Sequence, residues 1–354
     1  METLHMANTI KYSIPFNGDL DLMKWAIASG QVYEVYFTGP QGYDYSSKYQ
    51  NLRLNTEEQV AELIRFCAKN GIGRNYLMNK SILYFDNVKN IFSYIKSLDQ
   101  FGGLTSVTIA DRMIVPHLAK AFPDLCIQSS VFLHFDTANK VREAWKMGMK
   151  SFCLDVSCNR NGQELEKIRD MKKHYPGMTI KLLTNHGCFQ HCFYLPVHEN
   201  WPVLKDVKGN AEDQKYMLGN MVNGEACIFK TTSQADEIKR SFIRPEDISY
   251  YEERGLMDYV KIVYRQDPTP VLKKKIQAYL DRSYDGDMFD ISTSNKGQFS
   301  SICDNKKFPS GFVEKVLYCG FACETCNYCD GVANKVFGTN EAMKDLPAPI
   351  GTRS

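Results

Sequence analysis

The residues with the clearest chemical potential are cysteines, and they gather in two places. Near the C-terminus, the stretch CGFACETCNYC places Cys319, Cys323, Cys326 and Cys329 within eleven residues. Thiolates at this C-x3-C-x2-C-x2-C spacing can converge on one iron–sulfur cluster, and a zinc ion held by four thiolates is the alternative. We favour a cluster, because zinc knuckles usually draw on two separated pairs. Four unligated thiols this close together would invite oxidation.

The second group lies in LLTNHGCFQHCFY, directly after a predicted strand. Cys188 and Cys192 are separated by three residues, and Cys227 follows in GEACIFK. Three thiolates that meet could hold a 4Fe-4S cluster with one iron open to a substrate, a water or a ligand from elsewhere. A tail cysteine could also close this cluster, so the sequence is compatible with one cluster or two. His186, beside Cys188, is a candidate catalytic residue, as a ligand, a proton donor or an orienting group.

Eight short β-rich runs alternate with amphipathic stretches that have helical periodicity. This alternation predicts an α/β protein with a (β/α)8 TIM-like barrel, and a doubly wound open sheet is the structural alternative. The runs are rich in Val, Ile, Tyr and Thr, as buried strands are. They cover residues 10–16, 32–39, 73–79, 104–111, 125–134, 150–157, 178–185 and 257–265.

Polar residues recur where these runs end, and this recurrence favours the barrel, because the loops after its strands build the active site. Each polar residue alone is more simply a turn former or a helix cap. We nevertheless expect some of them to bind substrate or move protons. The catalytic candidates are Asp111, Asp155, Lys261 and Arg265, together with His186.

The pattern also predicts the domain organisation. Residues 1–282 form the barrel, interrupted between strands seven and eight by an insertion over the barrel mouth at about residues 193–243. Residues 283–354 form a loop-rich tail that packs on the barrel and delivers the C-terminal cysteines.

Composition places the chain among globular proteins of a reducing compartment. Hydrophobic residues make up 44% of the 354 residues, and the formal net charge is +2. Charge therefore gives no indication of nucleic acid, although a local basic groove is compatible with it. No targeting segment or membrane span is visible, so we expect a cytoplasmic protein with reduced cysteines. We interpret the remaining cysteines as structural (Cys67, Cys126, Cys153 and, least firmly, Cys158) or leave them undecided (Cys303).

Several stretches resemble the collagenase-like peptidase U32 family. They are NHGCFQHCFY with a later cysteine, IRPEDISYYEERG with KIVYR, and GDLDLMKWAIASGQVYEVYFTG near the start. The tail is similar to the ending of a short subgroup. Other members are similar to oxygen-independent hydroxylation proteins for RNA bases or ubiquinone, which hold a 4Fe-4S cluster with four cysteines. The resemblance implies Cys188, Cys192 and Cys227 as ligands. The better known HGxLCxxxxGxC pattern is altered here, which leaves the fourth ligand and the substrate unassigned.

These observations together predict an iron–sulfur enzyme that modifies an organic substrate at the barrel mouth, by oxygen-independent hydroxylation or a related reaction. The substrate would be an RNA base, a quinone precursor or a peptide, and we expect an electron donor protein as a partner. One alternative is a peptidase, either cysteine-type or metal-dependent. The other is a non-catalytic iron–sulfur redox or accessory subunit. The sequence leaves a homo- or hetero-oligomer open.

Overall fold

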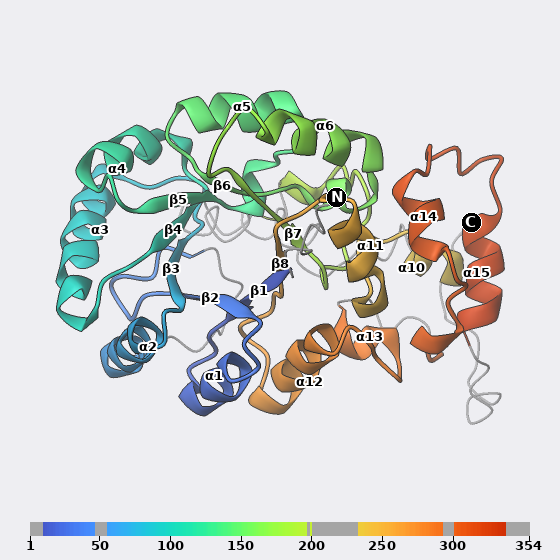
Figure 1. Ribbon diagram of the computed structural model, residues 1–354, viewed down its shortest axis with the longest axis horizontal. Helices are drawn as coiled ribbons and strands as arrows, with labels where there is room; N and C mark the ends of the chain where they lie inside the picture. Colours follow the sequence, from blue (N-terminus) through green and yellow to red (C-terminus); the bar gives the residue numbers. More distant parts are fainter. Residues whose placement is uncertain (1–9, 47–54, 197–198, 200–232, 293–300, 338–354) are drawn as a thin grey trace, which may run out of the picture.

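The protein is a closed barrel of eight parallel strands that neighbour one another in chain order, so the predicted barrel topology is confirmed. The computed structural model describes residues 10–46, 55–196, 199, 233–292 and 301–337 (Figure 1). Strand β1 also pairs with β8, which closes the sheet. The strands are β1 (Lys11–Pro15), β2 (Val32–Phe37), β3 (Gly73–Met78), β4 (Ser106–Ile109), β5 (Cys126–Ser129), β6 (Ser151–Cys153), β7 (Thr179–Leu183) and β8 (Tyr259–Lys261).

All eight strands lie within the runs predicted from the sequence, but they end earlier. Strand β4 ends at Ile109 rather than at Asp111, and β6 ends at Cys153. The reason is local, because Asp111 and Asp155 cap the 3-10 helices that follow. Their carboxylates accept hydrogen bonds from backbone N–H groups two residues on, which turns the chain out of the sheet.

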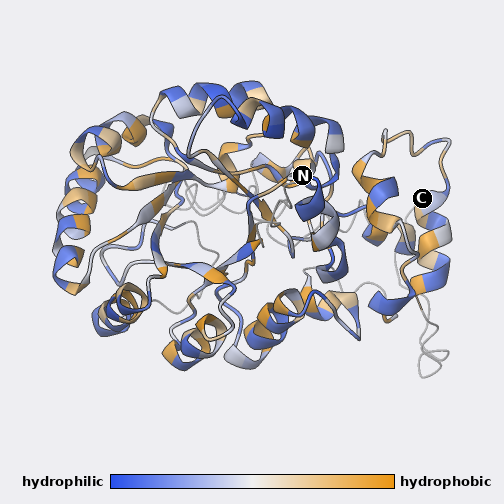
Figure 2. Cartoon of the chain, in the orientation of Figure 1, coloured by the Kyte–Doolittle hydropathy of each residue, from blue (hydrophilic) through white to orange (hydrophobic). Residues whose placement is uncertain are grey.

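Helices cover the outside of the barrel. Helix α2 begins with a capping box in which Thr56 and Gln59 bond to each other's backbone N–H groups, and the helices carry both hydrophobic and hydrophilic residues (Figure 2). The surrounding helices are α1 (Leu20–Ile27), α2 (Glu57–Lys69), α3 (Phe85–Ser97), α4 (Val115–Ala121), α5 (Ala138–Lys146), α6 (Gly162–Lys172), α11 (Ile248–Glu253) and α12 (Thr269–Leu280). The 3-10 helices are η1 (Leu98–Phe101), η2 (Arg112–Ile114), η3 (Val131–Leu133), η4 (Val156–Arg160), η5 (Pro245–Asp247) and η6 (Asn305–Lys307).

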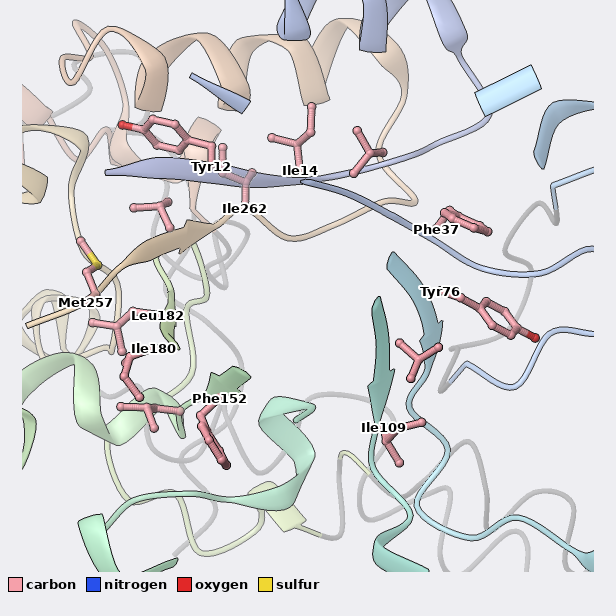
Figure 3. Packing of buried hydrophobic residues seen from close by; sticks show 14 of the residues in the cluster. Tyr12, Ile14, Phe37, Tyr76, Ile109, Phe152, Ile180, Leu182, Met257 and Ile262 are labelled. Carbon is pink, nitrogen blue, oxygen red and sulfur yellow. The ribbon is translucent and has the colours of Figure 1, made fainter. Parts of the chain in front are cut away.

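The apolar side chains of the strands pack against this ring of helices. Successive side chains on a strand point to opposite faces, so every second residue faces outward. Ile14, Phe37, Tyr76, Ile109 and Leu182 are buried in one large hydrophobic cluster with residues of the helices (Figure 3). The hydrophobic core of the protein therefore lies between the sheet and the helices.

The alternate side chains point into the barrel, and many of them are polar. Glu34 on β2 accepts hydrogen bonds at 2.7 Å from Lys181 on β7 and at 2.6 Å from Gln128 on β5. Because these strands are not neighbours, the bonds must cross the barrel interior. The Glu34 carboxylate also accepts bonds from Ser13, Asn75 and Ser106, on β1, β3 and β4.

Electrostatics in this network favour the ionised form of Glu34. Burial raises the pKa of Glu34, but the Lys181 ammonium and the hydrogen bonds to the carboxylate outweigh burial and lower its pKa to about 2. Both side chains are 2% exposed. A buried ion pair is tolerated when the remaining hydrogen-bonding positions are satisfied, and the polar residues of four further strands do this here.

The tail forms a small lobe beside the barrel. Its helices are α13 (Met288–Ile291), α14 (Phe312–Leu317) and α15 (Tyr328–Val336), and α10 (Gln234–Ile238), from the region between β7 and β8, packs against α15 (Figure 1). These elements share a second hydrophobic cluster, separate from the main core. Part of the region that we expected over the barrel mouth is thus attached to the tail, while residues 197–198 and 200–232 of it lie outside the described residues.

The lobe approaches the barrel most closely at Gly162, the first residue of α6. A Cβ atom at this position would come within 2.5 Å of the Tyr318 ring and 3.0 Å of the Leu317 side chain. The Tyr318 hydroxyl donates a hydrogen bond to Glu166 on the next turn of α6. Glycine is therefore required here for close packing.

Among the residues that the structure describes, none of the helices has the length and apolar character needed to cross a bilayer.

We predict that Lys181→Met destabilises the protein by about 3–5 kcal/mol, because the Glu34 carboxylate would remain buried without its cation. Urea denaturation measures this change in the free energy of unfolding. Glu143→Gln is the control, since Glu143 forms an exposed pair with Lys146, and its loss should leave the free energy of unfolding nearly unchanged. Equal effects of the two substitutions would contradict a structural role for the barrel pair.

Candidate functional site at the barrel mouth

The loop after β7 brings two cysteines to the mouth of the barrel. Cys188 and Cys192 are both half-buried, and both pack against one small apolar cluster that includes Val131, Cys153 and Leu183. Cys153 and Leu183 end β6 and β7, and Val131 begins η3, just after β5. The thiols therefore lie at the end of the barrel where the loops of such folds build active sites.

A segment from the far side of the insertion fixes this loop. The backbone N–H of Ser241 donates to the Cys188 carbonyl at 2.8 Å, and Arg240 donates to the Gly187 carbonyl at 2.6 Å. The Arg240 guanidinium is buried, pairs with Glu237 through two hydrogen bonds, and lies 4.3 Å from the centre of the Phe189 ring. The cysteine loop is thus held by backbone and charge contacts from the residues that follow α10.

His186 lies next to the first thiol. Its Nε2 is 3.9 Å from the Cys188 Sγ, and its ring is parallel to that of Tyr264, with 6.3 Å between the ring centres. This position agrees with the expectation that His186 borders the cysteine site. An imidazole here can orient a sulfur ligand or exchange a proton with a bound group.

A histidine between two carboxylates forms a second group at the mouth. His134 Nδ1 lies 2.7 Å from an Asp155 oxygen, and Nε2 lies 3.2 Å from a Glu199 oxygen. Hydrogen bonds to Asp155 and Glu199 raise the pKa of His134 to about 9, although burial opposes this. Burial raises the pKa of Asp155, but its hydrogen bonds to His134 and Ser157 outweigh burial and lower it. Burial raises the pKa of Glu199. His134 is therefore an imidazolium at neutral pH.

Lys261, at the end of β8, is a buried cation. It is 8% exposed, and its Nζ lies 4.5 Å from the centre of the Tyr36 ring. Burial lowers the pKa of Lys261, and the neighbouring Cys153 opposes this shift. No carboxylate pairs with Lys261 among the described residues. A buried amine without an anion is suited to bind an anionic or carbonyl group.

Arg265 lies at the edge of a polar cavity. The cavity has a volume of about 250 Å³ and is also lined by Asn17, Thr38 and Asn55, from the loops after β1 and β2. Arg265 donates to the Ser46 hydroxyl at 3.0 Å, and Ser46 in turn donates to Asp44. Burial lowers the pKa of Arg265. This side chain is placed to contact a polar ligand in the cavity.

Asp111 has a mainly structural environment. Its two carboxylate oxygens accept hydrogen bonds from the backbone N–H groups of Met113, at 2.8 Å, and Leu83, at 2.7 Å. These bonds hold the loop after β3 against the start of η2. Among the described residues, no hydrogen bond or ion pair joins Asp111 to the cysteine loop or to His134.

Cys319, Cys323 and Cys326 lie on the loop between α14 and α15, Cys329 lies in the first turn of α15, and the loop touches the β7 loop. The rings of His191 and Phe321 meet edge to face with 5.2 Å between their centres. His191 stands between Cys188 and Cys192, and Phe321 stands between Cys319 and Cys323. The two cysteine groups, more than 120 residues apart in the sequence, are therefore neighbours in space.

The thiols at the barrel mouth provide part of the ligand set that an iron–sulfur cluster requires. Cys188 and Cys192 offer two thiols on one loop beside an apolar wall, which suits an iron–sulfur group. Cys227 lies outside the described residues. Within the described part of the chain, no three His, Cys, Asp or Glu side chains are placed to hold a metal ion. The thiols present fit the group chemically, and the third ligand would come from the region around residue 227.

Sequence reasoning did not identify His134, Glu199, Glu34 or Lys181. Glu34 and Lys181 left a signal, because a charged residue inside a run such as VYEVYF or TIKLL is unusual for a buried strand. His134 ends a predicted strand, as the chosen candidates did. Cys153, which we interpreted as structural, lies in the same cluster as Cys188 and near Lys261.

The chain is similar to known proteins in both sequence and fold. No protein-family model matches the chain. It is 28% identical over 265 residues to the uncharacterized protease MJ1657 of Methanocaldococcus jannaschii, which covers 75% of this chain and 74% of the relative. The solved structure of the U32 peptidase Mk0906 covers 76% of this chain and 98% of its own, with a TM-score of 0.50 and 14% identity. The resemblance to the U32 family is confirmed. The likeness to the solved U32 structure concerns the fold.

We predict that His134 stabilises the protein most strongly at low pH. Its folded pKa, about 9, lies above the unfolded value, so the contribution is complete below about pH 6.5 and disappears as pH rises through about 9. His134→Asn should therefore cost roughly 2 kcal/mol at about pH 6 and much less at about pH 9.5, by urea denaturation. Exposed His174 provides the control substitution. A cost that does not change with pH would contradict the ion pairs.

Proposed function

We propose that the protein is an iron–sulfur enzyme that modifies an organic substrate at the barrel mouth, by oxygen-independent hydroxylation or a related reaction. The observation that supports this most directly is the position of Cys188 and Cys192 on one loop at the C-terminal end of a closed barrel. Cys188, Cys192 and Cys227 would hold the cluster. When bound, it would supply electron transfer or Lewis acidity at an open iron.

Residues around the barrel mouth would bind the substrate, donate a proton and exclude water. Lys261 and Arg265 are cations on or just after β8, and both would bind an anionic or carbonyl oxygen of the substrate. His134 is held as an imidazolium by Asp155 and Glu199, so it would donate a proton or a charged hydrogen bond. The apolar wall around Val131 and Leu183 would exclude water from the thiols.

Peptide hydrolysis is the second candidate. The relative in Methanocaldococcus jannaschii is named a protease, and His186 Nε2 is 3.9 Å from the Cys188 thiol. A cysteine nucleophile needs a base at about this place. Peptidase activity in metal-free protein that a thiol alkylator abolishes would favour this function over the iron–sulfur reaction.

We predict that protein prepared without oxygen and supplied with iron and sulfide is brown, and that Cys188→Ser with Cys192→Ser removes a full cluster. Counting iron and sulfide, with electron paramagnetic resonance, checks this. About four irons per chain would indicate one cluster and about eight would indicate two. Cys67→Ala is the control, because Cys67 is buried in α2 within the main core. An unchanged iron content in the double variant would refute the assignment.

A further inference from the structure

The tail loop that carries four cysteines lies against a buried arginine from the barrel. Cys319 follows α14, and Cys329 lies in the first turn of α15. Arg160 ends η4, which contacts α14. The guanidinium lies over the rings of Phe242 and Phe312, at 5.0 Å and 5.5 Å from their centres. Both rings belong to the hydrophobic cluster against which Cys329 packs.

Arg160 is an incompletely satisfied buried cation. It is 3% exposed, and its Nη1 donates to the Ile238 carbonyl at 2.6 Å. Its Nε and Nη2 have no hydrogen-bond partner among the described residues. No carboxylate forms an ion pair with it in the same part of the chain. Burying a guanidinium with unsatisfied N–H donors costs free energy. An additional anion beside Arg160 would reduce this cost.

Two tail thiols are among the ionisable groups that interact with Arg160, together with Tyr251 and Asp247. Burial lowers the pKa of Arg160, and Cys329 is the strongest opposing influence, with Cys319 also contributing. A second cation stands close by, because Cys323 and Asp330 lie near Lys239, whose ammonium pairs with Asp236 at 2.8 Å. Two cations, Arg160 and Lys239, thus lie close to the cysteines of the tail.

The loop already has one backbone hydrogen bond to a cysteine sulfur. The backbone N–H of Phe321 donates to the Cys319 sulfur at 3.4 Å, with Phe321 in the left-handed region at a φ of 55°. Hydrogen bonds from backbone N–H groups to ligand sulfurs tune metal–thiolate centres. Cys323 and Cys326 are exposed and lie on the same loop, so a metal can reach them from solvent.

We propose that Cys319, Cys323, Cys326 and Cys329 bind a thiophilic metal centre of their own, and that Arg160 balances part of its charge. Four thiolates around a zinc ion or an oxidised 4Fe-4S core leave about two negative charges, and the buried Arg160 guanidinium, which has no carboxylate partner among the described residues, compensates one of them. Metal binding releases the thiol protons and draws the exposed cysteines of the loop toward Cys329. This centre does not depend on the function proposed for the barrel mouth.

Metal counting on two double variants tests the site. Wild type, Cys323→Ser/Cys326→Ser and Cys188→Ser/Cys192→Ser are prepared without oxygen, once with iron and sulfide and once with zinc alone. We expect the tail variant to lose one centre in at least one preparation, while the mouth variant keeps it. The preparation that shows the loss identifies the metal. Wild-type metal content in the tail variant under both conditions would overturn the proposal.

Arg160 is tested by the rate at which a chelator removes the metal. Arg160→Met should release the tail metal about 10–100 times faster than wild type, because the charge partner is lost. Arg160→Lys retains the charge and should restore slow release. Thermal unfolding of the metal-free proteins shows whether the substitutions merely loosen the lobe. Equal release from wild type and Arg160→Met would overturn the role given to Arg160.

Discussion

The buried ion pair between Glu34 and Lys181 is the constraint on which the barrel depends. It joins β2 and β7 across the interior, and its hydrogen-bond partners come from four further strands. A barrel filled this way differs from one whose interior is packed with branched apolar side chains. Once the ion pair is formed, a shift of either strand by one residue would move a charge into the apolar layer between sheet and helices.

This polar interior also prepares the chemistry at the mouth. Lys261, Cys153 and Tyr36 face the same interior nearer the carboxyl ends of the strands. The candidate site at the barrel mouth is therefore adjacent to the hydrogen-bond network of Glu34 and Lys181. Glu34 forms an ion pair with Lys181 and does not pair with Lys261. Two buried lysines of the described barrel interior therefore differ in their partners: Lys181 completes a salt bridge with Glu34, and Lys261 has no carboxylate partner. Their difference follows from position along the strands rather than from residue type.

The sequence predicted the fold well because strand alternation and helix periodicity are local signals. The eight runs and the order of elements needed only residues that favour strands and the amphipathic periodicity of the helices between them. Strand ends were less accurate, because Asp111 and Asp155 act through side-chain hydrogen bonds that residue type alone does not reveal. The site was predicted in part. His186 and the two cysteines are near one another because they share a loop, whereas His134, Glu199 and Arg160 act through contacts between distant segments, which a single sequence does not encode visibly.

The short stretch after α10 has an additional consequence. Residues 240–243 hold the β7 loop by its backbone, while α10 itself packs on α15 of the tail. The segment from α10 to residue 243 therefore contacts both the β7 loop and the tail. A displacement of the lobe would shift Gly187 and Cys188 through these contacts, without a ligand that moves between the barrel mouth and the tail. For this reason the barrel mouth and the tail lobe are structurally coupled, because one segment contacts both.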